Sequence, residues 1–255
     1  MPFEKIDAAR LSGAIIRQIE TLILQGVLRP GERLPGERDL AERMNVSRPS
    51  LREALAAMQE DGLLVTRPGS GVFVADVLGS AFSPALVRLI ARHPEAADDY
   101  LTFRKDLEGL AAERAATAAG ETDLQVLDRI LTAMRHAHAK GDPEAEAALD
   151  ADFHMAIVEA SHNVIALHMM RAMQDLLRQG MLFNRPRIFT SPEQRDRILD
   201  QHAAINDALQ ARDGMAARRA LEAHLDFVAA TLTAQRRADE HAAVARLRLQ
   251  NRPEG

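Results

Sequence analysis

The sequence predicts a mainly α-helical protein in two parts, and three observations lead to that prediction. Apolar residues recur at the three- and four-residue spacing of amphipathic helices along most of the 255 residues. Hydrophobic residues make up 47% and aromatic residues 4%, so the core must rest on aliphatic residues that suit helices. Strand signals are confined to residues 63–74. The length allows one large domain or two ordinary ones.

Composition and charge exclude several classes of protein. The absence of cysteine excludes disulfides and thiolate metal sites. The N-terminal residues lack the apolar stretch of a signal peptide, and no segment is long and apolar enough to cross a membrane. We therefore expect a soluble, cytoplasmic protein. The net charge of −5 argues against a generally basic nucleic-acid-binding surface.

The first predicted helix spans residues 9–26 and ends at Gly26, before the turn Arg29-Pro30-Gly31. Its apolar stripe consists of Leu11, Ile15, Ile19 and Leu22. Arg38 then lies at the start of a second, short helix. In that helix Leu40 and Met44 share one face. This part of the chain therefore supplies two helices with apolar faces.

Residues 34–55 predict two short helices joined by a tight turn. Asn45 ends the first, because its side chain tolerates the left-handed backbone conformation. Ser47 is a suitable N-cap for the second, and Pro49 falls in its first turn, where a missing N–H costs nothing. The residues that then face a core are Leu51, Leu55 and Met58, while those that point outward are Arg48, Ser50 and Arg52.

This layout is typical of a helix-turn-helix, which inserts the start of its second helix into the DNA major groove. Arg48 and Arg52 lie one turn apart, and each can reach a guanine edge or a phosphate. Residues 1–75 contain ten Lys/Arg and ten Asp/Glu, so DNA binding must rest on few, well-placed phosphate contacts. A surface helical hairpin with solvated arginines is the alternative.

Two short aliphatic runs, residues 63–66 and 72–74, flank a Gly/Pro-rich turn and predict a β-hairpin. Beside a helix-turn-helix, such a hairpin is a wing. Arg67 at its tip could enter the minor groove, and Gly69 and Gly71 would let the backbone approach DNA closely. A purely structural hairpin is the alternative.

From residue 84 onward only helical signals are found, after a short linker at residues 76–83. We assign residues 1–75 to a DNA-binding domain, 84–235 to a helical domain and 236–255 to a charged C-terminal tail that is expected to fray. Thr122 and Ser191 have the character of N-caps. The expected helices span residues 84–92, 97–119, 122–140, 143–160, 163–182, 191–211 and 214–245.

Four ionisable residues of the second domain are predicted to face its apolar interior. Asp150 and His154 are spaced i, i+4 on one helix face, and His202 and His224 each lie on the apolar stripe of another helix. Burying such groups is costly unless they are paired or bind a metal. One Asp and three His suit Zn, Ni, Mn or Fe. A structural role in the core stays open at this point.

Arg104 and Glu108 form a further i, i+4 pair among leucines. One interpretation is an ion pair on the helix surface. The other is that Arg104 lines a pocket and binds a small carboxylate bidentately.

Residues 10–75 resemble the winged helix of the GntR family of transcriptional regulators, on the stretches LRPGERLPGERDLA, VSRPSLREAL and GSGVFV. The resemblance implies the fold class: mainly α, with an N-terminal winged helix-turn-helix followed by an all-α helical bundle effector domain. It also implies a set of contacts to operator DNA, namely Arg38, Ser47, Arg48, Ser50, Arg52, Arg67 and Gly69.

The second domain resembles the all-helical effector (FCD) domain of the FadR-type branch of this family. The resemblance implies that a divalent metal ion is held by Asp150, His154, His202 and His224, and that Arg104 contacts a small organic acid. Stretches such as ARHPEAADDY and VEASHNVIALHMMRAM are most similar to repressors of the pyruvate dehydrogenase complex. The complete tetrad departs from those repressors and matches the lactate-responsive relatives.

We therefore expect a homodimeric repressor that binds a pseudo-palindromic operator and responds to pyruvate, with lactate or another hydroxy acid as the alternative effector. Two rival hypotheses stay open. A metal-dependent enzyme could use the tetrad to activate water, although no HExxH-type motif accompanies it. A metal sensor would respond to the ion itself.

Overall fold

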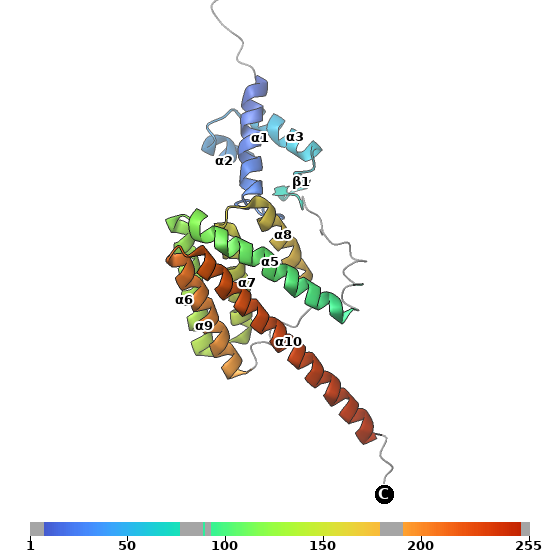
Figure 1. Cartoon of the computed structure of the whole chain (residues 1–255). Coiled ribbons are helices and arrows are strands. Elements are labelled where there is room, and N and C mark those ends of the chain that lie inside the picture. Colours follow the sequence, from blue (N-terminus) through green and yellow to red (C-terminus); the bar gives the residue numbers. More distant parts are fainter. Residues whose placement is uncertain (1–7, 77–88, 90–92, 179–190, 251–255) are drawn as a thin grey trace, which may run out of the picture. The chain divides into compact units, whose positions relative to one another are not determined.

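The computed structural model describes residues 8–76, 89, 93–178 and 191–250 (Figure 1). The chain divides into two compact units, Met1–Ala81 and Phe82–Gly255. The prediction of a mainly helical fold is confirmed, and the strands of the described residues form one two-stranded sheet. Most of the expected linker at 76–83 and of the expected helix at 84–92 lies outside the described residues. Among the described helices, none has the length and apolar character needed to cross a membrane.

The first unit contains the helices α1 (Ala8–Leu24), α2 (Glu37–Arg43) and α3 (Arg48–Glu60) and the strands β1 (Leu64–Arg67) and β2 (Gly71–Val74). Its core is formed mainly by Ile15, Ile19, Ile23, Leu34, Leu51, Leu55, Met58, Leu64 and Val74. The predicted stripe on the first helix is partly wrong, because Leu11 is 39% exposed and Ile23 is buried in place of Leu22. A straight helix keeps the i, i+4 row of Ile15, Ile19 and Ile23 on one face.

The turn between α2 and α3 has the predicted geometry. Asn45 has a φ of 51°, in the left-handed region. The Ser47 hydroxyl accepts a hydrogen bond from the backbone N–H of Ser50 at 3.3 Å, which caps α3 as predicted. Leu51 near the start of α3 and Met58 near its end are completely buried. The outward-facing residues of α3 are therefore held on a rigid helix.

The wing pairs Leu64 with Val74 and Arg67 with Gly71 in an antiparallel register. Gly69 and Gly71 have φ values of 71° and 108°, a region that other residues rarely adopt. A further segment, not predicted from the sequence, joins the outer edge of β2: the Leu34 N–H donates to the Val72 carbonyl at 2.9 Å. The strand β2 is thus held at both edges, by β1 on one side and by the segment at Leu34 on the other.

The second unit contains the helices α5 (Pro94–Ala118), α6 (Glu121–Lys140), α7 (Pro143–Ala160), α8 (Val164–Arg178), α9 (Pro192–Gln210) and α10 (Gly214–Gln250). The predicted ranges agree closely, with two corrections. Gly120, not Thr122, caps α6, because Asp123 Oδ2 accepts the Gly120 N–H at 2.8 Å. The helix α10 continues to Gln250, beyond the fraying expected after residue 236, because residues 234–250 are rich in good helix formers such as Ala, Arg and Leu.

The helix α7 contributes to the interior of the second unit, where Phe153 and Ile157 are completely buried against α5, α6 and α9. A partly buried ion pair fixes α9 to α7: Arg195 donates to Glu146 from Nε at 2.9 Å and from Nη2 at 2.5 Å. The start of α10 lies directly on α5, because a Cβ at Gly214 would come within 2.7 Å of the Glu113 carbonyl oxygen. These contacts fix the three helices that carry the predicted tetrad.

Candidate metal centre and nucleic-acid interface

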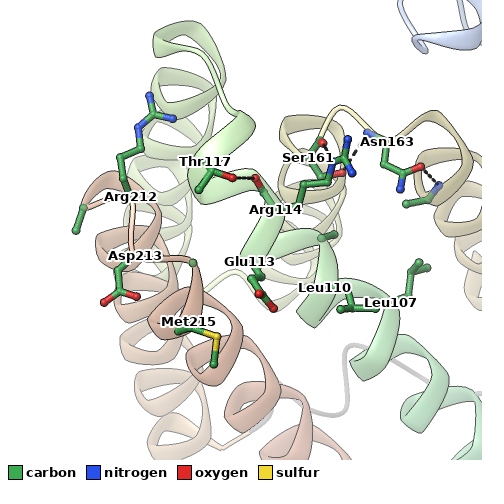
Figure 2. Close-up of a pocket in the computed structure, with 14 residues that line it drawn as sticks. Leu107, Leu110, Glu113, Arg114, Thr117, Ser161, Asn163, Arg212, Asp213 and Met215 are labelled. Carbon is green, nitrogen blue, oxygen red and sulfur yellow. Dashed lines mark hydrogen bonds between the residues drawn. The ribbon is translucent and has the colours of Figure 1, made fainter.

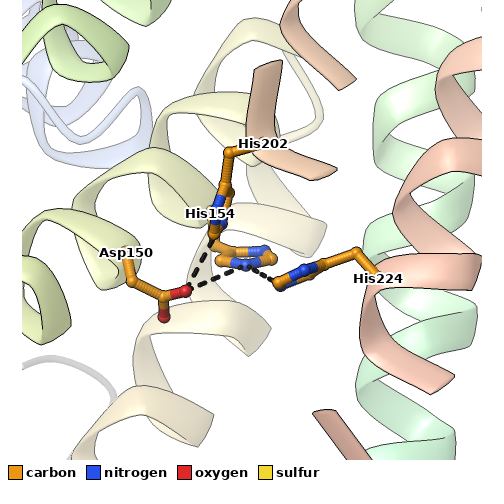
Figure 3. Close-up of side chains that lie close together, drawn as sticks. All are labelled: Asp150, His154, His202 and His224. Atoms are coloured by element: carbon orange, nitrogen blue, oxygen red, sulfur yellow. Dashed lines mark hydrogen bonds and ion pairs between the residues drawn. The ribbon is translucent and has the colours of Figure 1, made fainter. Parts of the chain in front are cut away.

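The four residues of the predicted tetrad come together inside the second unit (Figure 3). The helix α7 supplies Asp150 and His154, α9 supplies His202 and α10 supplies His224, and all four are buried. Asp150 Oδ1 lies 3.3 Å from His202 Nε2 and 3.8 Å from His154 Nε2. One ligand atom from each residue lies within 4.8 Å of the others.

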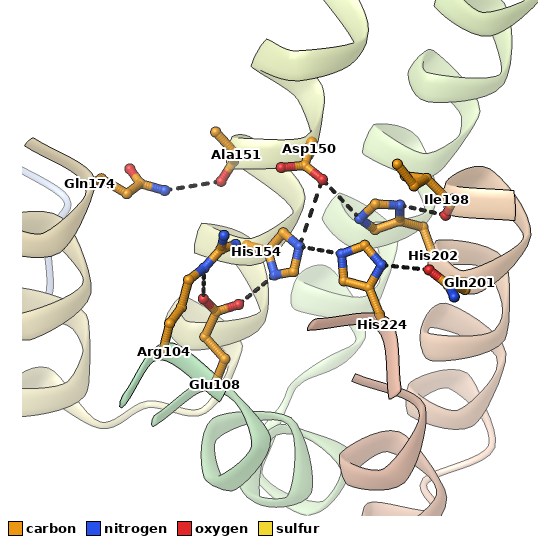
Figure 4. Close-up of polar contacts among 10 residues, drawn as sticks. All are labelled: Arg104, Glu108, Asp150, Ala151, His154, Gln174, Ile198, Gln201, His202 and His224. Atoms are coloured by element: carbon orange, nitrogen blue, oxygen red, sulfur yellow. Dashed lines mark hydrogen bonds and ion pairs between the residues drawn. The ribbon is translucent and has the colours of Figure 1, made fainter. Parts of the chain in front are cut away.

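The other ring nitrogen of each histidine faces an oxygen (Figure 4). The Nδ1–H of His202 donates to the carbonyl of Ile198 at 2.9 Å, and that of His224 donates to Gln201 Oε1 at 3.0 Å. The Nδ1–H of His154 donates to the carboxylate of Glu108. Since Nδ1 carries the proton in each ring, all three Nε2 atoms offer a lone pair to the same point.

The residues of this cluster fit a bound cation. His154 Nε2 and His224 Nε2 are 3.2 Å apart, so their lone pairs repel unless a cation or a proton lies between them. Protonation is disfavoured, because burial and the neighbouring His202 hold the pKa of His224 well below its usual value. Burial also lowers the pKa of His154, against the opposing effect of Glu108. Three neutral imidazoles and a carboxylate are suitable ligands for a divalent metal ion.

Arg104 and Glu108 are buried beside this cluster, so the alternative interpretation of an ion pair on the helix surface is excluded. Arg104 Nε donates to Glu108 Oε1. Burial alone would raise the pKa of Glu108, but the charges of Arg104 and His154 lower it to about 2. Burial opposes the charge of Arg104, yet Glu108 raises its pKa above the usual value. Both side chains are therefore charged.

One nitrogen of the Arg104 guanidinium makes no hydrogen bond within the described part of the chain. Arg104 is only 4% exposed, and its Nη2 has no hydrogen-bond partner among the described residues. A buried N–H of a charged guanidinium without an acceptor is costly. This atom is therefore a candidate contact for an anionic ligand.

A separate, open groove of about 840 Å³ lies between α5 and the turns that follow α7 and α9 (Figure 2). Its two arginines serve the fold: Arg114 Nε donates to the Ser161 carbonyl at 2.9 Å, and Arg212 donates to the Ala119 carbonyl. Neither Arg104 nor any member of the tetrad lines this groove. The groove therefore contains none of the residues that the sequence predicts for the metal and the effector.

In the first unit, the predicted DNA contacts lie around α3 and the wing. Six are exposed and Ser50 is half-buried: Arg38, Ser47, Arg48, Arg52, Arg67 and Gly69 are the exposed ones. The hydroxyls of Ser47 and Ser50 are hydrogen-bonded at 2.8 Å. The guanidinium of Arg67 lies 4.4 Å from the centre of the Phe73 ring. The structure thus presents all seven in one unit.

Sequence reasoning missed an acidic partner of these arginines. Arg52 Nε donates to Glu37 Oε2 at 2.6 Å, and Arg48 Nη2 lies 3.9 Å from the same oxygen. Glu37 begins α2, so it is distant in sequence from the arginines of α3. It also missed Arg33, which lines a cavity of about 470 Å³ together with Arg52 and Arg67.

Comparison with family models identifies both units. Residues 11–74 match the model "Bacterial regulatory proteins, gntR family", and residues 99–227 match the model of the FCD domain. This chain belongs to the GntR family. It is a member of the FadR-like branch with an FCD domain, and FCD domains are known to bind metal ions.

Two curated relatives of this GntR-family chain are transcriptional regulators. It is 35% identical over 246 residues to the "Putative L-lactate dehydrogenase operon regulatory protein" of Escherichia coli (strain K12), covering 93% of each chain. It is 32% identical over 217 residues to the "Glc operon transcriptional activator" of the same strain, covering 84% of this chain and 85% of the relative. The chain is therefore a DNA-binding transcriptional regulator and not an enzyme.

A solved structure supports the fold alone. The Streptococcus agalactiae GntR structure aligns with a TM-score of 0.52 and 24% sequence identity, over 86% of this chain and 98% of that chain.

We predict that Arg48→Ala and Glu37→Gln change DNA binding in opposite directions. The first removes a candidate base contact worth roughly 1–3 kcal/mol, and the second frees two arginines from an internal carboxylate. Operator fragments are first selected from a random library with the wild-type chain. Arg48→Ala should then lose affinity for them, whereas Glu37→Gln should bind non-operator DNA more tightly, with a salt dependence steeper by about one phosphate contact.

Arg43→Ala is the control, because Arg43 pairs with Asp39 at 2.9 Å and is outside the predicted contacts. Equal operator affinity in wild type and Arg48→Ala would refute the assignment of α3 as the recognition helix.

We also predict that the double variant His202→Ala/His224→Ala loses bound metal, because it removes two of the four converging ligands. Metal content per chain after dialysis against Zn²⁺ should fall to background, while DNA binding by the first unit persists. The matched control is His136→Ala/His162→Ala, which removes two exposed histidines. Stoichiometric metal in the double variant would contradict the assignment of these ligands.

Proposed function

We propose that this chain is a homodimeric repressor whose binding to a pseudo-palindromic operator is controlled by a small carboxylate. The effector would bind between Arg104 and a divalent metal ion held by Asp150, His154, His202 and His224. The single observation that carries the proposal is the unpartnered, buried Nη2 of Arg104, a residue that Glu108 links to His154 of the histidine cluster. When bound, the metal would supply a Lewis-acid position for an oxygen of the effector.

The charges of the buried groups support an anionic effector. Arg104 contributes +1, Glu108 and Asp150 contribute −1 each, and a divalent ion contributes +2, which leaves a net charge of +1. Uncompensated charge in a buried site is costly. One monocarboxylate would neutralise it and would accept the hydrogen bond that Arg104 Nη2 leaves unmade.

The identity of the acid is proposed at the level of small 2-oxo and 2-hydroxy monocarboxylates. The sequence resemblance placed pyruvate first. A relative described as a putative regulator of an L-lactate dehydrogenase operon, together with the complete tetrad, supports lactate as the candidate of equal standing.

The homodimer is supported by an apolar face on the second unit. Large apolar side chains are exposed on α5, α8 and the start of α10, namely Phe103, Leu110, Ile165, Met169 and Met215. Leu110 and Met215 line one groove together with Ala166, the neighbour of Ile165. Exposed large apolar side chains on packed helices favour an interface, and a two-fold operator requires a second copy of the chain.

We predict that Leu110→Glu/Ile165→Glu converts the dimer into a monomer, because two charges would be buried in the interface. Sedimentation velocity measures the mass directly. Leu247→Glu, which changes a residue that is 60% exposed on α10, is the control and should stay dimeric. A double variant that sediments as the wild type does would place the dimer contact elsewhere.

We predict that pyruvate or L-lactate raises the melting temperature of the chain and that prior chelation abolishes the effect. A ligand at ~100 times its Kd adds ~2.7 kcal/mol, which corresponds to roughly 5 °C or more for a chain of this size. Glycolate, acetate and citrate complete the panel. Arg104→Ala should remove the response, because it deletes the carboxylate contact.

The outcomes separate the alternatives. No shift of the melting temperature with any acid, together with a large drop of that temperature on chelation, would refute the carboxylate proposal and leave the metal as the signal or as a structural ion.

Operator affinity measured with and without the active acid then shows whether the acid releases or strengthens DNA binding. Release by about 5- to 150-fold supports a repressor, and tighter binding supports an activator.

A further inference from the structure

One carboxylate, that of Glu108, is shared by the candidate effector arginine and a candidate metal ligand (Figure 4). Its Oε1 accepts from Arg104 Nε, and its Oε2 accepts from His154 Nδ1. Glu108 is fully buried, so water does not take over either role. It reaches from α5 to α7 and thereby joins two helices across the core.

We propose that Glu108 is a positioning residue that couples metal binding to carboxylate binding, so that each strengthens the other. The inference rests on the function proposed above and assigns a residue to its regulation. It concerns the hydrogen bonds of Glu108 and not a change in its protonation.

The coupling follows from the competition of two donors for one carboxylate. A cation on His154 Nε2 would polarise the Nδ1–H of the same ring and strengthen its bond to Glu108. The hydrogen bond from Arg104 to Glu108 would weaken as a result. The positive charge of the guanidinium would then be less compensated, so Arg104 would bind an anion more tightly. Conversely, an anion bound to Arg104 would weaken the hydrogen bond from Arg104 to Glu108. Glu108 would then accept a stronger hydrogen bond from His154, which would make that ring a better metal ligand. Such coupling is necessarily reciprocal.

The other two histidines offer no comparable connection. His202 and His224 donate their Nδ1–H to neutral oxygens, the carbonyl of Ile198 and the amide of Gln201. Asp150, the other carboxylate of the cluster, lies on the Nε2 side of His154 and His202. Among the described residues, only His154 therefore has a charged acceptor at Nδ1, and that acceptor also holds Arg104.

The first test is the Zn²⁺ affinity of Glu108→Gln, measured on the full chain by competition with a chromophoric chelator at pH 8. Glutamine keeps the size, but it replaces one of the two acceptor oxygens with an NH₂ donor, which would face either Arg104 Nε or the Nδ1–H of His154. Loss of such a supporting hydrogen bond typically lowers metal affinity by about 10- to 100-fold. We expect a decrease in this range, whereas unchanged Zn²⁺ affinity would overturn the proposal.

Arg104→Met separates coupling from general damage to the core. This change removes the competing donor and a nearby positive charge, and it leaves Glu108 to His154 alone. Zn²⁺ affinity should stay the same or rise. A decrease as large as that of Glu108→Gln would mean that the pair only maintains the fold. Glu113→Gln, on the same helix and paired with Arg218 at 3.0 Å, is the matched control and should bind Zn²⁺ as the wild type does.

The second test measures the coupling itself. The Zn²⁺ affinity of the wild type is determined with and without saturating L-lactate, and in parallel with pyruvate. We expect one of the acids to raise Zn²⁺ affinity by about 5- to 150-fold. The increase should be smaller in Glu108→Gln, where only the direct contact between the acid and the metal would still couple the two ligands.

The two proposals fail in different ways. A wild-type chain that binds no Zn²⁺ refutes both the proposed function and the coupling. A wild-type chain that binds Zn²⁺ and an acid, with the same coupling in Glu108→Gln, refutes only the role of Glu108. Circular dichroism of each variant at the assay temperature confirms that the affinity refers to folded protein.

Discussion

The buried charges at the centre of the helical unit are the constraint on which the rest of that unit depends. Three imidazoles, two carboxylates and a guanidinium lie in a core otherwise built from Leu, Ile, Ala and Phe. Desolvation of such groups is unfavourable unless each has a partner. The helices that carry them must therefore be held in fixed positions, and Arg195 with Glu146 and the close approach at Gly214 provide part of that restraint.

The DNA-binding unit solves a different electrostatic problem. Its first 75 residues are neutral overall, and Glu37 lies close to Arg48 and Arg52 of α3, the proposed recognition helix. These ion pairs are solvent-exposed and contribute little to folding stability. They do lower the positive potential that generic DNA phosphates would meet, so binding must depend more on contacts to base edges. Neutral composition is then compatible with specific recognition of DNA.

The sequence contained enough information to predict the tetrad, the capped turn and the wing. Asp150 and His154 share a helix face by spacing alone, and His202 and His224 lie on apolar stripes, so burial could be inferred for all four. Asn45 and Ser47 act through their own backbone or that of a residue three positions away. Local rules of this kind do not need the tertiary structure.

The side-chain pairs that sequence reasoning missed at the two candidate sites are tertiary. Glu108 reaches His154 across 46 positions, and Glu37 reaches Arg52 across 15, so neither pairing has a spacing signature. The exposed Leu11 illustrates a second limit. An apolar stripe predicts which face of a helix is buried, but not how far along the helix the packed core extends. The helix beyond residue 236 illustrates a third case, in which the charge of a segment concealed a high intrinsic helix propensity.

Charge balance also bears on whether a metal alone could be the signal. A divalent ion on the tetrad would satisfy the lone pairs of the three Nε2 atoms, but it would leave a net charge of +1 and the Nη2 of Arg104 without an acceptor. The metal-loaded site is therefore still incomplete by both electrostatics and hydrogen bonding. A carboxylate supplies both missing elements at once, and a neutral ligand supplies at most one. The arrangement of Arg104 and Glu108 thus favours a sensor of small acids over a sensor of the ion itself.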